Sequence, residues 1–565
     1  MGYEERAPQP AIRQFGGLNT KDSELGLPGF DSPYMLNVDL HPHGSLRSRG
    51  GTLALSTPTG EDMINAVMRL NQPEDDRGWV YVIADGSIYR APEPGTWTWE
   101  EPQYTGPSSL TMPSQHSYGR ANARYYDESG STEYPSVLYL PRSDGKPVIL
   151  LGQVAAVGDI IDMPTGVLGD GSPGSGTKGY HPDWVAGNWP TKMRLVGAGR
   201  GSSMLAWGLH DNPNLLYYSE LDVPYNFLQN DIDDAVGAQP LIDGGYAAIR
   251  QGDGDEIMSV VDMFGYWVIF KKRTTFVYTG HPGNDNTWSI VAEYPVGCVS
   301  DRAWAKIGND IIFWAEDGPR ILSAVEKYGD LEQSNLAFKI NDDVRDVDPG
   351  SYERICCYHD ITNMRVVFFV PSPAASHNDV GYIYYYNSGE WSKWNGPAVE
   401  MMDVEVIRTT SQQNDRIVGG SYENGVVQLQ QGYTDADIDD DDDDIAADYY
   451  TNWINIGEIS DASRVLLLDV MFGDDGANVD IYYQTDLNSA WTQITRIERA
   501  MGGGGKPWGK LTWGTDAWGT VGRAFNRYEL DALFNLIRFR FAKTGSQGFE
   551  VMGYRMEIRK KGLRA

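Results

Sequence analysis

The sequence has little cysteine, little histidine and no recognisable catalytic motif. Its 565 residues include three cysteines, Cys298, Cys356 and Cys357, of which two are adjacent and poorly placed to pair with each other. We therefore expect folding in a reducing compartment without a disulfide framework. Eight histidines are scattered, and only His41 and His43 lie close together. Neither the HExxH motif of zinc proteases nor the GxSxG motif of serine hydrolases occurs, so the sequence predicts no enzyme, no catalytic residues and no metal centre.

Long apolar segments are also lacking. No run approaches the eighteen apolar residues that a membrane-spanning helix requires. The first ten residues, MGYEERAPQP, do not follow the basic and then apolar pattern of a secretion signal. We expect neither a membrane span nor a signal peptide, and hence synthesis and folding in a cytoplasm.

Basic residues are outnumbered by acidic ones. The chain has 46 Lys and Arg against 78 Asp and Glu, a formal net charge of −32. Residues 501–565 hold twelve Lys and Arg against five Asp and Glu, so residues 1–500 carry about −39. This balance argues against a protein that clamps nucleic acid, because phosphate binding needs a surplus of positive charge.

Short strands and tight turns dominate what is present. The 64 glycines and 30 prolines favour turns, and seven segments repeat one pattern of apolar strand, short polar turn and second apolar strand. These hairpins begin at Trp79, Val137, Leu205, Trp267, Ile311, Arg365 and Arg416. Their starts are 44 to 68 residues apart, close to the spacing of four-stranded propeller blades with loop insertions. The pattern predicts an all-β fold containing a β-propeller of six or seven blades; an array of separate β-sandwiches is the alternative.

An acidic run divides the chain. Asp439 to Asp444 are six consecutive aspartates, which repel one another too strongly for a packed strand. Beyond them, apolar and polar residues alternate as in strands that cover one core. We predict an N-terminal arm with the first strands (1–54), a β-propeller (55–434), an acidic linker (435–448) and a C-terminal β-sandwich or jelly roll (449–565).

Several segments form an ordered series along the chain. They are Phe15–Thr20, Tyr34–Asp39, Gly44–Gly50, Val296–Ser300, Ile312–Trp314 with Asp317 and Gly318, and the acidic turn before the C-terminal domain. In this order they resemble the tail-nozzle and packaged-DNA-stabilisation proteins of tailed bacteriophages, the tail tubular protein B-like family. One departure is Gly50, which stands where the family usually has a proline.

The resemblance implies a virion structural protein. It implies a homohexameric ring at the lower end of a short phage tail, which continues the DNA channel, retains the genome before infection and guides DNA ejection. The expected partners are other copies of the chain, a tail adaptor protein, tail fibres or tailspikes, and genomic DNA that passes through the lumen without sequence-specific binding. No cofactor is expected. The alternatives are a propeller enzyme or lectin acting on host surface polysaccharide, and a tail-tip or hub protein of a long-tailed phage.

The acidic run invites a calcium interpretation, because its aspartates alternate as EF-hand ligands do. Asp440, however, stands where such a loop needs glycine, and Ala446 stands where it needs glutamate. We expect a solvated loop, with an irregular cation site as the alternative. The alternating residues are Asp435, Asp437, Asp439 and Asp441.

Two further segments near the C-terminus carry weak signals. Gly502 to Gly505 and Lys506 superficially suggest a phosphate-binding loop, but Pro507 follows the lysine and no metal-binding Ser or Thr is present, so we expect a flexible loop. Three tryptophans recur every five residues, and we expect them to pack against their own domain or a neighbouring subunit; stacking on sugars is the alternative. They are Trp508, Trp513 and Trp518.

Basic residues crowd the last eleven positions, which suggests attachment to acidic partners; a solvated tail is the alternative. They are Arg555, Arg559, Lys560, Lys561 and Arg564.

Overall fold

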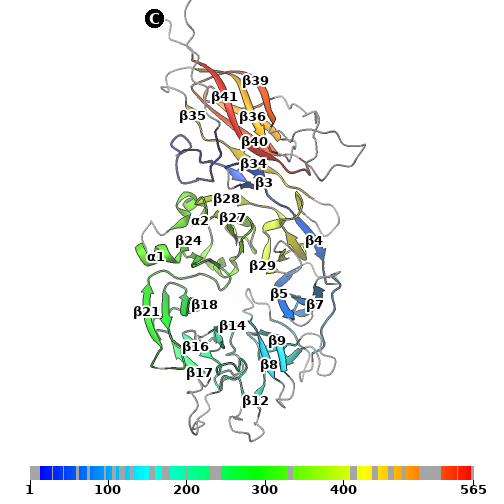
Figure 1. Cartoon of the computed structure of the whole chain (residues 1–565), viewed down its shortest axis with the longest axis vertical. Helices are drawn as coiled ribbons and strands as arrows, with labels where there is room; N and C mark the ends of the chain where they lie inside the picture. Colours follow the sequence, from blue (N-terminus) through cyan, green and yellow to red (C-terminus); the bar gives the residue numbers. More distant parts are fainter. Residues whose placement is uncertain are drawn as a thin grey trace, which may run out of the picture.

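The computed structural model consists almost wholly of β-strands (Figure 1). It describes residues 13–27, 29–41, 44–58, 63–72, 77–93, 97–104, 110–113, 121–126, 133–151, 160–167, 178–197, 202–228, 244–284, 286–328, 335–407, 416–435, 443–455, 463–473, 479–494, 524–543 and 545–560. Outside the described residues lie His43, Asp437, Asp439 to Asp442, Gly502 to Lys506, the three C-terminal tryptophans, Lys561 and Arg564.

Within the described chain, seven small antiparallel sheets stand in a ring and form the blades of a β-propeller (Figure 1). Blade 1 contains β5 (Ile64–Gln72), β6 (Arg77–Ala84) and β7 (Ser87–Glu93). Blade 2 contains β8 (Ala121–Tyr126), β9 (Glu133–Leu140), β10 (Val148–Leu150) and β11 (Ile160–Asp162). Blade 3 contains β14 (Lys192–Gly197), β15 (Ser202–Trp207), β16 (Leu215–Tyr218) and β17 (Gly245–Ala248). The short pair β12 (Thr165–Val167) and β13 (Lys178–Gly179) lies between blades 2 and 3 in the sequence.

The remaining blades follow in chain order. Blade 4 contains β18 (Ile257–Met263), β19 (Tyr266–Lys271), β20 (Thr275–Thr279) and β21 (Ser289–Tyr294). Blade 5 contains β22 (Trp304–Ile307), β23 (Asp310–Ala315) and β24 (Gly318–Ile321). Blade 6 contains β25 (Cys356–Asp360), β26 (Arg365–Val370), β27 (Val380–Tyr385) and β28 (Glu390–Trp394). Blade 7 contains β29 (Met401–Ile407), β30 (Arg416–Ser421), β31 (Val426–Leu429) and, from the N-terminal part of the chain, β4 (Thr52–Ser56).

Strand β4 closes the ring. It pairs antiparallel with β31, with Thr52 opposite Leu429, while β29 of the same blade lies beside β5 of blade 1. The first and last blades are thereby joined by residues from both ends of the propeller sequence. The prediction of an all-β propeller of six or seven blades is confirmed, with seven blades.

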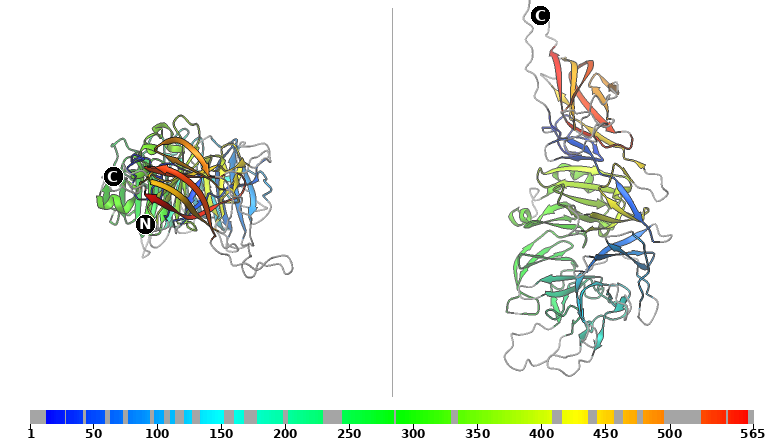
Figure 2. Two further views of the ribbon diagram at one scale, coloured as in Figure 1. Left: turned by 90° about the horizontal axis from the view of Figure 1, so that it is seen from above. Right: turned by 45° about the vertical axis from the view of Figure 1, so that its right-hand side comes forward.

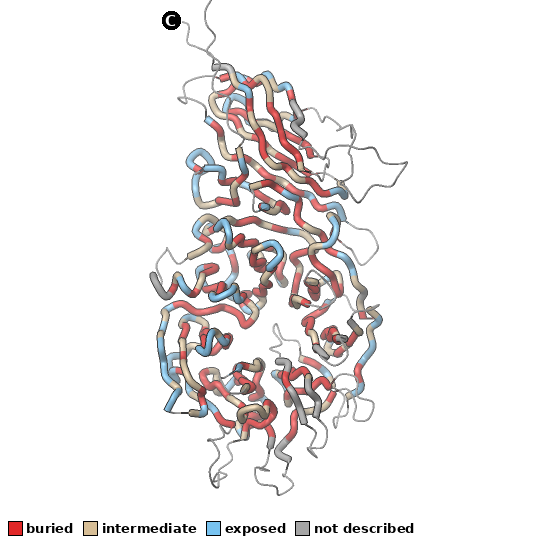
Figure 3. The backbone as a smooth tube through the Cα atoms, in the orientation of Figure 1, coloured by how far each residue is buried: buried red, intermediate tan, exposed pale blue. Residues whose placement is uncertain are grey.

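Apolar faces of neighbouring blades pack on each other and form the propeller core. Trp207 and Trp267 are buried in the cluster between blades 3 and 4, and the rings of Trp314 and Phe368 meet between blades 5 and 6 with centroids 5.3 Å apart. Figure 3 shows buried residues along most of the strands. One blade alone would leave such faces in water, so stacking the blades provides the hydrophobic stabilisation.

A helical insertion separates blades 5 and 6. It contains α1 (Leu322–Tyr328), η2 (Leu336–Ile340), α2 (Asn341–Arg345) and η3 (Pro349–Arg354), and η4 (Pro397–Val399) lies between blades 6 and 7. The side chain of Asn335 accepts a hydrogen bond from the backbone N–H of Ala337 and so caps η2. The insertion places Lys339 and Asp343 against the N-terminal segment.

The second domain is a sandwich of two antiparallel sheets at one end of the elongated molecule (Figure 2). One sheet has the order β1 (Met35–Leu36), β34 (Ala447–Tyr450), β40 (Leu536–Lys543), β37 (Val479–Thr485) and β38 (Asn488–Ile494), with β35 (Ile454–Asn455) also pairing with β40. The other has the order β2 (Val38–Leu40), β3 (Leu46–Ser48), β41 (Glu550–Lys560), β36 (Ser463–Phe472) and β39 (Ala524–Phe534). The expected C-terminal β-sandwich is therefore present.

The described residues of the segment 1–54, which was expected to hold an arm and the first strands, contribute strands to both domains. Strands β1, β2 and β3 belong to the sandwich, whereas β4 belongs to blade 7. The propeller is thus inserted between two parts of the sandwich sequence. At the return point, β32 (Thr434–Asp435) pairs with β33 (Asp443–Asp444), so both ends of the segment expected to be an acidic linker (435–448) contribute to strands.

Candidate functional site

The most elaborate polar site in the described chain is the joint between the sandwich and blades 6 and 7. We define the joint as residues 15–20 and 30–51 together with the propeller and linker residues that they contact. Phe15 anchors its first segment in the sandwich core, where its ring meets the rings of Tyr449 and Phe541 edge to face at 5.3 and 5.5 Å. Such T-shaped pairs are favourable beyond the area that they bury.

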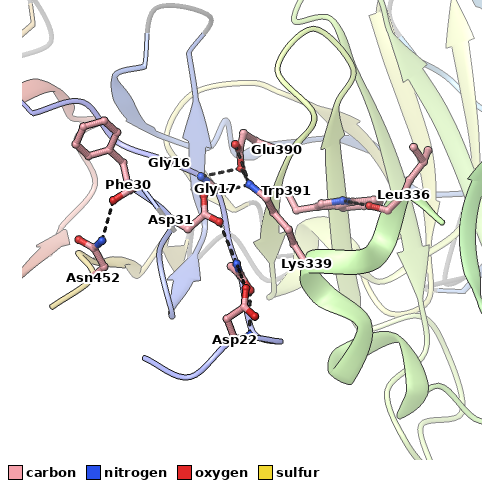
Figure 4. Close-up of polar contacts among 12 residues, drawn as sticks. Gly16, Gly17, Asp22, Phe30, Asp31, Leu336, Lys339, Glu390, Trp391 and Asn452 are labelled. Atoms are coloured by element: carbon pink, nitrogen blue, oxygen red, sulfur yellow. Dashed lines mark hydrogen bonds and ion pairs between the residues drawn. The ribbon is translucent and has the colours of Figure 1, made fainter. Parts of the chain in front are cut away.

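Gly16 and Gly17 allow two backbones to approach closely at this point. A Cβ atom on Gly16 would lie 2.7 Å from the carbonyl carbon of Phe30, and one on Gly17 would lie 2.9 Å from the backbone nitrogen of Trp391. The N–H of Gly17 donates to Oε2 of Glu390 at 3.1 Å (Figure 4). The next N–H, of Leu18, donates to the carbonyl of Trp391 at 2.8 Å. The glycine pair therefore has a packing role.

Lys339 connects three parts of the joint. Its ammonium group lies 3.1 Å from a carboxylate oxygen of Asp31 and 2.8 Å from one of Glu390 (Figure 4). Burial by itself lowers the pKa of Lys339, but its hydrogen bond with Glu390 and the charges of both carboxylates outweigh burial and raise that pKa. The ammonium group stays charged and holds the N-terminal segment to blade 6.

Asn37 lies at the centre of the second segment. Its φ angle of 54° places it in the left-handed region, which asparagine tolerates better than most residues. Its side-chain oxygen accepts hydrogen bonds from Nε of Arg49 and from the backbone N–H of Asn395, both at 2.9 Å. Its side-chain amide donates to the carbonyl of Ala446 at 2.8 Å. One side chain thus links the propeller, the sandwich and the linker.

Arg49 is buried, with a side chain 1% exposed, and is fully hydrogen-bonded. Besides Asn37, its guanidinium donates to the carbonyls of Gly50 and Asn395 and to both carboxylate oxygens of Asp435. A buried charge is tolerated when it is paired and hydrogen-bonded in this way. Asp435, considered above as a calcium ligand, instead pairs with Arg49.

Arg365 forms a second buried cation network on the propeller side. Its guanidinium contacts carboxylate oxygens of Asp39 at 2.7 Å and Asp360 at 2.9 Å, and it lies 4.9 Å from the ring centroid of Trp394. Burial opposes its charge, but Asp39, Tyr385 and Asp360 raise the pKa of Arg365 well above its usual value. Asp39 also accepts hydrogen bonds from Tyr385 and Trp394, so it binds three propeller residues.

Two cavities flank the joint. The larger, about 850 Å³, is lined by Phe15, Phe30, Asp31 and Lys339 among others. The smaller, about 310 Å³, is lined by Asp39, Arg47, Arg365 and Tyr433 among others. Four of the charged groups that line them are paired across the joint, Lys339 with Asp31 and Arg365 with Asp39.

The other candidate residues are dispersed. The described residues contain no group of three or more His, Cys, Asp or Glu that could hold a metal ion. All three cysteines are buried, and burial raises the pKa of the Cys298 thiol to about 12, which disfavours the reactive thiolate. Asp443 and Asp444 are exposed in β33. In the described part of the chain, no helix is long and apolar enough to cross a bilayer.

The fold and joint define a two-domain β protein, a seven-bladed propeller locked to a sandwich. No family model and no curated protein matches the sequence. Solved structures give only distant similarities. BBS1N, from a complex with ARL6DN, is 11% identical with a TM-score of 0.28, covering 74% of this chain and 96% of that one. A glycoside hydrolase is 10% identical with a TM-score of 0.27, and the match covers 90% of this chain and 99% of the hydrolase chain. The Pan2 WD40 domain of Neurospora crassa is 9% identical with a TM-score of 0.37, and the match covers 68% of this chain and 94% of the Pan2 chain. The propeller assignment therefore rests on the sheet order described above.

Proposed function

We propose that this chain is a structural subunit of a bacteriophage tail, the nozzle that assembles into a homohexameric ring, and that it has no enzymatic activity. The observation that carries the proposal is the position of the N-terminal residues behind the phage-tail resemblance, whereas its segments between Val296 and Gly318 lie at blade 5. Phe15, Gly17, Asn37, Asp39 and Arg49 all lie in the joint and fix the sandwich to the propeller. Their role is architectural, which supports a shared architecture rather than a shared reaction.

A rigid joint suits a ring subunit. A channel wall must keep its shape while a genome is held and then released, so the relative position of the two domains has to be set by many contacts. Two buried arginine networks and the Lys339 bridge act in parallel here. Removing one of them leaves the others in place.

The net negative charge supports a channel that lets DNA pass without binding its phosphates. With a formal net charge of −32, the chain lacks the surplus of Lys and Arg that would retain a sliding duplex through phosphate contacts. In the proposed virion the ring joins a tail adaptor protein above and carries tail fibres or tailspikes outside. DNA passes through the lumen without sequence-specific contacts.

Electron microscopy of the purified full-length chain, combined with native mass spectrometry, tests the proposal. We expect six-fold rings with an open centre. Trimers that degrade host surface polysaccharide, with activity lost on substitution of one Asp or Glu, would instead establish a propeller enzyme. Antibody labelling of virions distinguishes a nozzle from a tail-tip or hub protein. A nozzle is labelled at the end of a short tail, and a hub is labelled at the tip of a long tail.

A further inference from the structure

We infer that the outer edge of β21 is an assembly edge, completed by a strand from a second copy of this chain. We define the assembly edge as the side of Ser289–Glu293 that faces away from β20. The inference rests on the proposed ring and names the surface through which copies pair.

Outer strands of several other blades are covered by the chain itself. An isolated backbone pairing meets the outer strand of each of blades 1, 2 and 5 at one position, and the N-terminal segment pairs with the outer strand of blade 6. The pairs are Arg90 with Glu100, Ile160 with Gln103, Arg320 with Asn335, and Trp391 with Leu18. Across the described ranges, no segment pairs with the outer side of Ser289–Glu293. The backbone N–H and C=O groups on that side are free to pair with an added strand.

Blade 4 also differs from blades 3 and 7, for whose outer strands no such backbone pairing is described. Blades 3 and 7 end in β17 and β4, which are shorter than β21 and each expose one large apolar side chain. Strand β21 exposes two neighbouring ones, Ile290 at 55% and Val291 at 54%. A β-bulge opposite Val277 and Tyr278 leaves Val291 without a partner residue in β20. An uncovered edge with exposed aliphatic side chains is a template for strand addition.

Two of the usual protections against unwanted pairing, unpaired charge and proline, are lacking at this edge, although it carries a β-bulge. Natural edge strands are protected by unpaired charges or prolines, and Ser289–Tyr294 contains neither. Its single charged residue, Glu293, is held in an ion pair with Arg250. The assembly edge thus has no net charge to repel a partner strand.

Aromatic residues extend this surface along the same end of the blade. One row of cross-strand partners in this sheet contains Tyr266, Thr279 and Ser289. Phe264 lies in the turn before Tyr266. Phe264 is 65% exposed and has a φ angle of 50°, a conformation that turns normally reserve for Asn, Asp or Gly. The monomer shows no packing reason for a strained, exposed phenylalanine, whereas a partner subunit would bury it.

A second copy is the occupant that the chain itself supports. A cyclic ring needs two different surfaces on each subunit, one for each neighbour. The sandwich supplies a second surface, the exposed parts of the half-buried Trp453 and Trp491, whose ring centroids lie 4.6 and 5.2 Å from the guanidinium of Arg538, itself 11% exposed. Trp, Tyr and Arg are the residues enriched at interface centres.

Both surfaces carry charges that are already neutralised within the chain. Glu24 pairs with Arg538 at 2.8 Å, as Arg250 pairs with Glu293 on the assembly edge. Contacts between two such neutral surfaces suit a neighbouring subunit better than a nucleic acid or a highly charged peptide.

The test compares full-length wild type with Val291→Lys, which places a charge on the assembly edge. Ile361→Lys is the matched control, because Ile361 is also an exposed aliphatic residue but lies in the turn between β25 and β26. Native mass spectrometry gives the oligomeric state, and thermal unfolding confirms that each variant is folded. Hydrogen exchange of the amides of Ser289–Glu293 reports directly on strand addition, and we expect it to be at least about tenfold slower in the assembly than in the dissociated chain.

The inference is supported if the Val291→Lys variant no longer forms rings while wild type and Ile361→Lys retain them. Rings that persist in Val291→Lys, or amides that exchange equally fast in both states, overturn it while leaving the proposed ring intact. A smaller wild-type oligomer that Val291→Lys dissociates supports the assembly edge but overturns the hexameric nozzle. A wild type that stays monomeric at all concentrations overturns both.

Discussion

The guanidinium of Arg49 and the carboxylate of Asp435 form two parallel hydrogen bonds across 386 residues of sequence. Their side chains are 1% and 4% exposed, so the pair lies out of reach of solvent. Arg49 enters from the N-terminal segment and Asp435 from the strand that leaves the propeller. This pair therefore fixes the point at which the chain passes from the sandwich into the propeller and later returns to the sandwich.

Asp435→Asn should lower the free energy of unfolding by about 3–5 kcal/mol, because it leaves a buried guanidinium without its counter-charge. Urea unfolding followed by tryptophan fluorescence measures this loss. Asp342→Asn is the control, since Asp342 and Arg345 form an exposed pair at 3.9 Å that should contribute at most about 1 kcal/mol. Equal effects of the two substitutions would contradict the role assigned to Asp435.

Gly17→Ala should destabilise the joint by about 1–3 kcal/mol, because the new methyl group would overlap Glu390 and the backbone of Trp391. The same denaturation experiment measures the change. Gly197→Ala is the matched control, since no described atom lies within 4 Å of a Cβ at that position. A Gly17→Ala protein as stable as Gly197→Ala would show that the glycine is not required for close packing.

His281 should make the propeller sensitive to acid. It is buried between blades 3 and 4, where its Nε2 lies 2.8 Å from Oγ of Ser203, and burial lowers its pKa from 6.5 to about 4. A lowered pKa means that neutral His281 stabilises the fold above pH 6.5, and that this contribution is lost as the pH falls towards 4. The loss should reach about 3 kcal/mol.

Replacing His281 with glutamine removes the titrating group, so the difference in stability between wild type and His281→Gln should change between pH 7 and pH 4. His210→Gln is the control, because the side chain of His210 is exposed. Parallel pH profiles for wild type and His281→Gln would refute the assignment.

The purified chain should not bind duplex DNA tightly at physiological salt. Its formal charge of −32 opposes phosphate contact, and screening weakens any local attraction. Fluorescence anisotropy with a labelled duplex measures this, with a dissociation constant weaker than about 10⁻⁴ M expected at 0.15 M salt. Micromolar binding that weakens steeply with salt would show a basic surface that the net charge conceals.

The hairpin pattern predicted the propeller well. The seven hairpins found in the sequence are the second and third strands of the seven blades, from β6 and β7 after Trp79 to β30 and β31 after Arg416. These strands are apolar because both of their faces are covered by neighbouring blades, which makes them visible in the sequence. Outer strands such as β21 are more exposed and carry a weaker signal.

The joint was only partly predictable. The segments around Gly16, Asn37 and Arg49 were identified, but their partners Glu390 and Asp435 lie hundreds of residues away, and no local pattern indicates such pairing. For the same reason β1, β2 and β3 were assigned to an arm rather than to the sandwich. We grouped Asp435 with the aspartate run that follows it. In the structure, Asp435 is instead buried beside Arg49 and forms an ion pair with it.

The insertion of the propeller into the sandwich also sets an order of events during synthesis. Strand β4 cannot pair until β31 exists, and β3 waits for β41, near the end of the chain. At translation rates of about 5–20 residues per second, the first strands remain without their partners for roughly 20–100 s. Blades 1 to 6 can form during that time, but the ring closes only after β31 emerges, and the sandwich is completed only after β41 emerges. A ribosome that stalls before β41 would therefore release a chain whose N-terminal strands have unpaired edges, which makes truncated products prone to aggregation.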